Sequence, residues 1–274
     1  MTILKTSLLA LAALALGTSL ATAGTLDDIK ARGTLICGVL GTSQPYGFID
    51  PDTREVKGYE VDLCNMVAEK LGVTAEVKVT SSEARIPELM QGRVDMLAAL
   101  ISYSPERAEQ VDFSNSYLKE KFGFLAVEAA GITTLDGLDG QRLAINKGNF
   151  LEPLIKTRLP NASIIAFEEQ PLAFIAMQQG KAVALAGRFS SLRVLQLRAG
   201  TDAVPTVLID EPITTQSTGF IVRKGEDEFR EYLNGFLDEL EASGAAATLY
   251  SKWLGADSEF DFERTFVVGA PITE

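Results

Sequence analysis

The 274-residue chain contains no histidine, only two cysteines and one tryptophan, and fewer basic residues (25) than acidic ones (37). Without histidine there is no Ser-His-Asp or Cys-His nucleophile, no histidine general base and no His-ligated zinc or haem. The formal net charge of −12 argues against nucleic acid, because phosphate binding needs clustered lysine and arginine. The hydrophobic content of 46% is ordinary for a globular protein. We therefore expect a folded protein with no metal, no cofactor and no nucleic-acid partner.

The first 23 residues have the three regions of a secretory signal peptide. Lys5 supplies the positive start, residues 8–16 are leucine and alanine, and Ala21-Thr22-Ala23 is an A-x-A cleavage site. The apolar run is too short to act as a membrane anchor. We predict cleavage after Ala23 and export of the mature protein to the periplasm. The alternative is that residues 1–23 form an N-terminal core helix.

Export bears on whether the two cysteines are bonded or free. Cys37 lies in an apolar run typical of a buried strand, and Cys64 lies in residues 59–71, whose apolar residues have helical spacing. A strand and the helix that follows it usually pack together, so a bridge between the two sulfurs is geometrically reasonable. In an oxidising compartment such a pair is more often bonded than free. Two buried free thiols are the alternative.

Short apolar runs alternate with helical patterns along most of the chain, which is typical of an α/β fold with mostly parallel sheets. The predicted strands are Leu35–Val39, Ala75–Val79, Met96–Ala99, Phe122–Val127, Arg142–Ile145, Ser163–Phe167, Ala182–Ala186 and Thr218–Val222. The predicted helices are Leu26–Arg32, Glu60–Leu71, Arg85–Gln91, Leu151–Arg158, Pro171–Gln179 and Phe229–Leu240.

Two changes in composition divide the chain into domains. Residues 131–140 are rich in glycine and threonine, and a fresh alternation of strands and helices follows them. A new strand follows the turn-rich residues 210–217. We predict a discontinuous lobe 1 of residues 24–124 and 217–274, and a lobe 2 of residues 125–216. A ligand site between the two lobes is then the default expectation.

Several segments, in order and spacing, match the motifs of one protein family. They are Pro45-Tyr46-Gly47-Phe48, Gly58-Tyr59-Glu60-Val61-Asp62-Leu63, Arg85-Ile86-Pro87-Glu88-Leu89, Gly92-Arg93-Val94-Asp95, Ser104-Pro105-Glu106-Arg107, Asp112-Phe113-Ser114 and Tyr250-Ser251-Lys252-Trp253-Leu254-Gly255. Together they resemble the family 3 periplasmic solute-binding proteins, which deliver amino acids and related solutes to ATP-driven ABC importers. The resemblance covers essentially the whole mature chain.

The resemblance implies a type II periplasmic binding protein fold, in which two lobes close on a small solute. It places hinge strands near Lys121–Leu125 and Thr218–Ile221. It also implies a monomer whose partners are a small carboxylate or amino-acid-like ligand and the membrane permease of an ABC transporter. Some branches of the family carry matching cysteines, which favours the Cys37–Cys64 disulfide.

The resemblance also assigns residues of lobe 1 to the ligand. Arg107 occupies the position whose guanidinium grips the ligand carboxylate, a role that suits the planar fork of arginine. Ser102 matches a ligand-binding hydroxyl, and Ser82 and Arg85 match positions that reach a side-chain carboxylate in binders of acidic amino acids. The alternatives are a surface role for Arg107, a turn role for Ser102 and a purely structural ion pair for Arg85. Tyr46 and Phe48 are expected in the core.

Three positions depart from the family pattern. Ser43 stands where many members have a stacking aromatic, Phe150 replaces a hydroxyl, and Arg188 replaces the aspartate that accepts the ligand's α-ammonium. If Arg188 faces the cleft, it would repel an ammonium. We therefore expect an acid with two acidic groups or without an amine, rather than a standard zwitterionic amino acid. The alternative is that Arg188 points to solvent.

These observations favour a binding protein over an enzyme. A periplasmic dehydratase or lyase on the same fold is the first alternative, and Lys147 and Glu152 are the only obvious candidates for its general acid. The second alternative is a sensing or accessory protein that docks on another periplasmic protein.

Overall fold

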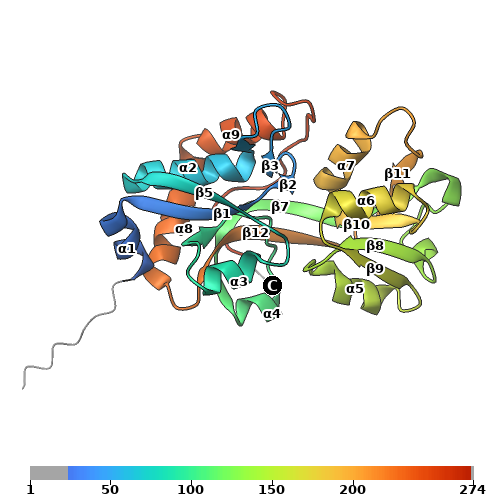
Figure 1. The fold of residues 1–274 in the computed structure, drawn as a ribbon, viewed down its shortest axis with the longest axis horizontal. Helices are drawn as coiled ribbons and strands as arrows, with labels where there is room; N and C mark the ends of the chain where they lie inside the picture. Colours follow the sequence, from blue (N-terminus) through green and yellow to red (C-terminus); the bar gives the residue numbers. More distant parts are fainter. Residues whose placement is uncertain (1–23, 273–274) are drawn as a thin grey trace, which may run out of the picture.

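The computed structural model describes residues 24–272, so the predicted signal peptide lies outside the described residues. Two lobes lie side by side and share one mixed sheet of nine strands (Figure 1). In the order in which they pair, eight of these strands are β5 (Thr74–Thr80), β1 (Thr34–Leu40), β6 (Met96–Leu97), β12 (Thr214–Arg223), β7 (Val111–Val127), β10 (Ala184–Arg188), β8 (Arg142–Asn146) and β9 (Ser163–Phe167). The ninth strand, β11 (Thr206–Leu208), pairs with β7.

The two lobes are joined by the long strands β7 and β12, which run from one to the other as an antiparallel ribbon (Figure 1). Within lobe 1, β1 pairs in parallel with β5 and β6, and within lobe 2, β8 pairs in parallel with β9 and β10. The predicted hinge segments lie in these two strands but are not opposite each other. Thr218 pairs with Leu118, whereas Lys121 pairs with Thr215. The ribbon also shifts register on both sides of Gly219.

Helices cover both faces of the sheet in lobe 1. Those of this lobe are α1 (Thr25–Arg32), α2 (Tyr59–Leu71), α3 (Arg85–Met90), α4 (Pro105–Ala108), α8 (Asp227–Ala242) and α9 (Ala245–Trp253). A separate small sheet consists of β2 (Thr42–Ser43), β3 (Gly47–Ile49) and β4 (Val56–Lys57). Among residues 24–272, no helix is long and apolar enough to span a membrane.

Lobe 2 has the same layered arrangement around a smaller part of the sheet. Its elements besides the strands are the 3-10 helices η1 (Glu128–Ala130) and η2 (Asp136–Leu138) and the α-helices α5 (Leu151–Arg158), α6 (Gln170–Gln178) and α7 (Phe189–Arg198). Side chains of β7 alternate between the two faces of the sheet. Phe122 and Phe124 pack in the hydrophobic cluster that includes α5, whereas Leu125 packs in the cluster that includes α6. This period of two is what the strand geometry requires.

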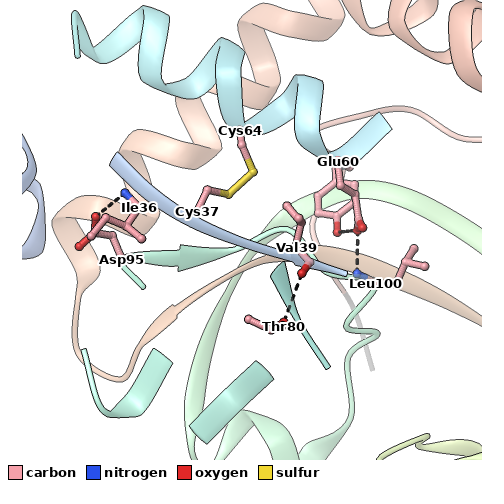
Figure 2. Close-up of a disulfide and its surroundings, with 9 residues drawn as sticks. Ile36, Cys37, Val39, Glu60, Cys64, Thr80, Asp95 and Leu100 are labelled. Carbon is pink, nitrogen blue, oxygen red and sulfur yellow. Dashed lines mark hydrogen bonds between the residues drawn. A yellow bond between two sulfur atoms is a disulfide. The ribbon is translucent and has the colours of Figure 1, made fainter. Parts of the chain in front are cut away.

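The core of lobe 1 contains the predicted disulfide. Cys37 of β1 and Cys64 of α2 are bonded, with their Cα atoms 6.0 Å apart and both side chains fully buried (Figure 2). Leu35, Cys37 and Val39 face α2 and α8 in one cluster, while Leu40 packs in the cluster on the opposite face of the sheet. The predicted bridge is therefore confirmed, and the alternative of two free thiols is wrong.

Candidate ligand-binding site

A cavity of about 60 Å³ lies at the junction of the two lobes. Lobe 1 lines it with polar side chains from β2, from α3 and α4 and from the loops before these helices, among them Ser43, Ser82, Arg85, Ser102 and Arg107. The lobe 2 side lines it with, among others, Phe122, Asn146, Asn149, Phe150, Gln170 and Arg188. All six residues predicted to bind the ligand are thus together at one cavity, although their role there stays a prediction.

Arg107 is placed by the short helix α4. Ser104 caps the helix, and its hydroxyl accepts the backbone N–H of Arg107 at 3.4 Å. The guanidinium donates to the carbonyl oxygen of Ser102 at 2.7 Å and, across the lobes, to that of Gly148 at 2.7 Å. Gly148 has a φ of 68°, which favours glycine. Burial, together with the positive charges of Arg85 and Arg188, lowers the pKa of Arg107 to about 9.

Arg85 begins α3 and is buried. Its guanidinium donates to the carbonyl oxygens of Ser82, at 2.8 Å, and Ala99. Burial lowers the pKa of Arg85 to about 10, although the nearby carboxylate of Glu60 acts in the opposite direction. Among residues 24–272, Arg85 forms no ion pair, so the predicted alternative of a structural ion pair is wrong.

Arg188 is the last residue of β10 and is only 4% exposed. One guanidinium nitrogen lies 3.2 Å from the hydroxyl oxygens of both Ser102 and Thr218, and the other lies 3.3 Å from a carboxylate oxygen of Glu120. Its Cζ atom lies 4.6 Å from the centre of the Phe122 ring. Arg188 therefore lies at the cavity, and the alternative that it points to solvent is wrong.

Two phenylalanine rings form the aromatic part of the cavity wall, which Leu40 and Leu100 also line. Phe122 and Phe150 meet edge to face, with ring centres 4.9 Å apart. The Cζ atom of Arg107 lies 5.8 Å from the centre of the Phe150 ring. An edge-to-face aromatic pair next to guanidinium groups is a favourable arrangement, because the ring faces are electron-rich. Phe122 was missed by the sequence analysis, because its position in a strand gives no sign of which neighbours it meets.

Glu169 connects the lobes beside the cavity. The residue precedes α6, and its carboxylate accepts the backbone N–H and the hydroxyl of Ser82, each at 3.1 Å. The hydroxyl of Thr42 donates to the same carboxylate at 3.1 Å. Ser82 therefore bonds to lobe 2, in addition to lining the cavity. A second contact between lobes joins the hydroxyls of Tyr46 and Ser190, 2.6 Å apart.

The sequence analysis also missed the polar side chains that lobe 2 contributes. Asn146 ends β8, as Arg188 ends β10, so both stand at the carboxyl edge of parallel strands, where ligand sites of α/β sheets occur. The side-chain oxygen of Asn149 accepts the backbone N–H of Leu151, the first residue of α5, at 3.1 Å. Asn146 could have been found from the sequence, because it directly follows the predicted strand Arg142–Ile145. No local pattern marked Asn149 or Gln170.

The core positions of Tyr46 and Phe48 are as predicted. Tyr46 is fully buried, and its hydroxyl donates to Glu120 at 3.0 Å. Phe48 is 8% exposed and packs edge to face on Trp253, with ring centres 6.2 Å apart. Neither residue lines the cavity.

The predicted general-acid candidates lie away from the cavity. Lys147 pairs with Glu168, and Glu152 pairs with Lys156 at 2.7 Å, with all four side chains at least 43% exposed. Neither Lys147 nor Glu152 lines the cavity. Among residues 24–272, no group of three or more cysteine, aspartate or glutamate side chains is arranged to hold a metal ion.

A family described as bacterial extracellular solute-binding proteins, family 3, matches residues 35–256. This match covers well over half of the chain. The chain belongs to this family. The resemblance of its motifs is thereby confirmed, and the two-lobed fold expected from them is the one that the structure has. The matched segment includes all of lobe 2, the joining strands and most of lobe 1.

Individual relatives agree with this assignment. The chain is 28% identical over 244 residues to the L-cystine-binding protein TcyJ of Escherichia coli (strain K12), covering 87% of this chain and 89% of the relative. It is 26% identical over 237 residues to the ABC transporter glutamine-binding protein GlnH of Bacillus subtilis (strain 168), covering 85% of each. Among solved structures, an ancestral amino acid-binding protein, AncCDT-1, a precursor of cyclohexadienyl dehydratase, matches with a TM-score of 0.76 and 29% identity. The match covers 84% of this chain and 99% of that one.

Proposed function

We propose that this protein captures an amino acid or a related small carboxylate between its two lobes and delivers it to the membrane permease of an ABC importer. The observation that carries the proposal is the cavity at the junction of the lobes, with Arg107 in its wall. The named relatives, which bind cystine and glutamine and include a glutamine-binding protein of an ABC transporter, support the same solute class.

Arg107 is the group proposed to grip the ligand carboxylate. A guanidinium has five N–H donors, and two bonds of Arg107 go to backbone carbonyl oxygens. Among residues 24–272, no carboxylate pairs with it. A half-buried cation without an anionic partner is costly, so a ligand carboxylate in the cavity would be bound strongly. The bond from Arg107 to Gly148 of lobe 2 would also couple ligand binding to closure of the lobes.

We propose no catalytic role for the cavity. A dehydratase or lyase needs a proton donor beside its substrate, such as a carboxyl group or a lysine. The described lining of the cavity contains neither, and Lys147 and Glu152 form exposed pairs elsewhere. A dehydratase is the second candidate, because AncCDT-1 is described as an amino acid-binding protein and as the precursor of a dehydratase. A sensing or accessory role would need the same cavity plus a docking partner.

The proposal includes the organisation of the mature chain. We place lobe 1 in residues 24–124 and 217–274 and lobe 2 in residues 125–216, so that both crossings fall inside or beside the ribbon of β7 and β12. The mature protein would be a periplasmic monomer that begins after Ala23. Intact mass of the exported protein tests the cleavage site, and size exclusion with light scattering tests the oligomeric state.

A thermal-shift screen tests the proposed function. The mature protein would be melted with amino acids, 2-oxo acids and dicarboxylates, because a ligand that binds only the folded state raises the melting temperature. At a concentration a hundred times the Kd, the stabilisation is about 2.7 kcal/mol. We expect at least one small carboxylate to raise the melting temperature and to be recovered unchanged after incubation. Conversion to a product would support the dehydratase instead, and a stable protein complex with no small ligand would support the accessory role.

A further inference from the structure

The charged groups that line the cavity are all of one sign. They are the guanidinium groups of Arg85, Arg107 and Arg188, and no aspartate, glutamate or lysine lines the cavity within residues 24–272. Neither Arg85 nor Arg107 has a carboxylate partner in that part of the chain. A cavity wall with three guanidinium groups therefore presents excess positive charge to whatever it holds.

Three carboxyl groups that contact residues of the cavity wall or act on their charges have partners of their own. The Glu120 carboxylate accepts the hydroxyl of Tyr46 and pairs with Arg188. The Glu169 carboxylate accepts three hydrogen bonds from Ser82 and Thr42. Glu60 is fully buried, and burial raises its pKa, which favours the neutral form. None of these three groups lines the cavity, so none is placed to receive a ligand ammonium.

The arginines also stand on both sides of an apolar surface. Arg107 lies against Phe150, and Arg188 lies against Phe122, while the two rings contact each other edge to face. A ligand with a short carbon chain could lie on the two rings and present an anionic or acceptor oxygen to each guanidinium. We infer that the ligand is a small carboxylate without an ammonium group, such as a 2-oxo acid or a dicarboxylate, an inference that rests on the proposed function.

The size of the effect follows from Coulomb's law. At an effective dielectric of about 20, an ammonium about 4 Å from a guanidinium is disfavoured by roughly a thousandfold in affinity. The pairing of Arg188 with Glu120 offsets part of that repulsion. We therefore expect the ammonium to weaken binding by about tenfold or more.

Isothermal titration of the mature protein with matched pairs tests the inference. The pairs are pyruvate against L-alanine and 2-oxoglutarate against L-glutamate, whose members differ at Cα in carrying a ketone or an ammonium, with L-glutamine and L-cystine as further ligands. We expect the 2-oxo member of at least one pair to bind at least tenfold more tightly than its amino counterpart and than L-glutamine. An amino acid that binds as tightly as the best 2-oxo acid would overturn the inference and leave the proposed function standing. Binding of none of the six compounds would overturn the inference, whereas the proposed function fails only if no compound of the wider thermal-shift screen binds.

A variant locates the source of the selectivity. Arg188→Gln removes the positive charge and releases the carboxylate of Glu120 from its ion pair, so the preference for the 2-oxo acid over the amino acid should fall at least tenfold. Arg193→Gln is the matched control, because Arg193 is an exposed residue of the neighbouring helix α7 whose guanidinium donates to Gln196 of the same helix. The preference of Arg193→Gln for the 2-oxo acid over the amino acid should equal that of the wild type. An unchanged preference in a folded Arg188→Gln protein would contradict the inference, and the wild-type comparison holds independently of any variant.

Discussion

The carboxylate of Glu169 accepts two hydrogen bonds from Ser82 across the boundary between the lobes, one from the backbone N–H and one from the hydroxyl, each at 3.1 Å. A third bond from Thr42 reaches the same carboxylate. These bonds exist only when the two lobes are in contact. Because a hydrogen bond to a charged group contributes about 1.5–3 kcal/mol, Glu169 stabilises the closed arrangement at the mouth of the cavity.

The first prediction concerns this contact. Glu169→Gln removes the charge and turns one acceptor into a donor that faces the donors of Ser82. We expect a loss of about tenfold in affinity for the tightest-binding compound of the screen, which corresponds to about 1.4 kcal/mol. Titration calorimetry measures it. Glu168→Gln is the control, because Glu168 is 63% exposed and pairs only with Lys147 in its own lobe. Equal affinities of the two variants would show that the contact does not stabilise closure.

The disulfide leads to the second prediction. Cys37 and Cys64 are 27 residues apart, and closing a loop of this length stabilises the folded state by about 3.5 kcal/mol on the chain-entropy model. The double variant Cys37→Ala, Cys64→Ala should melt about 10 °C below the oxidised wild type, since 1 kcal/mol shifts a domain of this size by about 2–4 °C. Reduced wild type should melt near the double variant. A double variant as stable as the oxidised protein would refute the prediction.

Glu60 gives a prediction about pH. Its carboxyl group is fully buried in lobe 1, where Oε1 accepts the backbone N–H of Leu100 at 2.7 Å (Figure 2). Oε1 also accepts the hydroxyl of Tyr117. Among the described residues, Oε2 has no hydrogen-bond partner. Burial raises the pKa of Glu60. The stability that this group contributes is therefore complete below its unfolded pKa and is lost as the pH rises through the folded pKa.

Urea unfolding at several pH values between 4 and 8 measures this dependence. The free energy of unfolding of Glu60→Gln, relative to the wild type, should increase from acid to neutral pH. Glu88→Gln provides a control of opposite sign, because hydrogen bonds from Lys78 and Arg93 lower the pKa of Glu88. The free energy of unfolding of Glu88→Gln, relative to the wild type, should decrease as the pH rises, since the stability from a lowered carboxyl pKa is lost on acidification. A pH-independent difference for Glu60→Gln would contradict the raised pKa of this buried carboxyl group.

Much of the fold follows from local sequence patterns. All eight predicted strands and six predicted helices are present, and the bounds of β9 and α5 agree with the prediction. These elements have continuous apolar runs or helical spacing, because each packs one whole face in a core. The first half of β7, Val111–Lys121, was missed because polar residues such as Asp112 and Asn115 interrupt its apolar ones, and two of its buried residues are serines. Helix α7 was missed because it follows Arg188 directly, with no turn residues between strand and helix.

The site was predictable only in part. Arg107 ends a recognisable motif, Ser102 stands five residues before it, and the structure brings both to the cavity. The contact between Glu169 and Ser82 joins residues 87 positions apart, and that between Arg188 and Ser102 joins residues 86 positions apart. Such contacts depend on how the two lobes meet, which no local pattern encodes. For the same reason, the sequence left open whether Arg188 points to solvent or to the cavity.

The most direct test of the account is the affinity of Arg107→Ala measured by titration calorimetry with the tightest-binding compound of the screen. Losing the charged partner of a buried carboxylate should cost about 2–5 kcal/mol, or 30-fold and upward in Kd. Arg93→Ala is the matched control in lobe 1, because Arg93 is 57% exposed and pairs with Glu88 outside the cavity. We predict that Arg93→Ala binds within threefold of the wild type and that a folded Arg107→Ala loses at least 30-fold. An Arg107→Ala protein that binds within threefold of the wild type would contradict the assignment of the cavity as the carboxylate site.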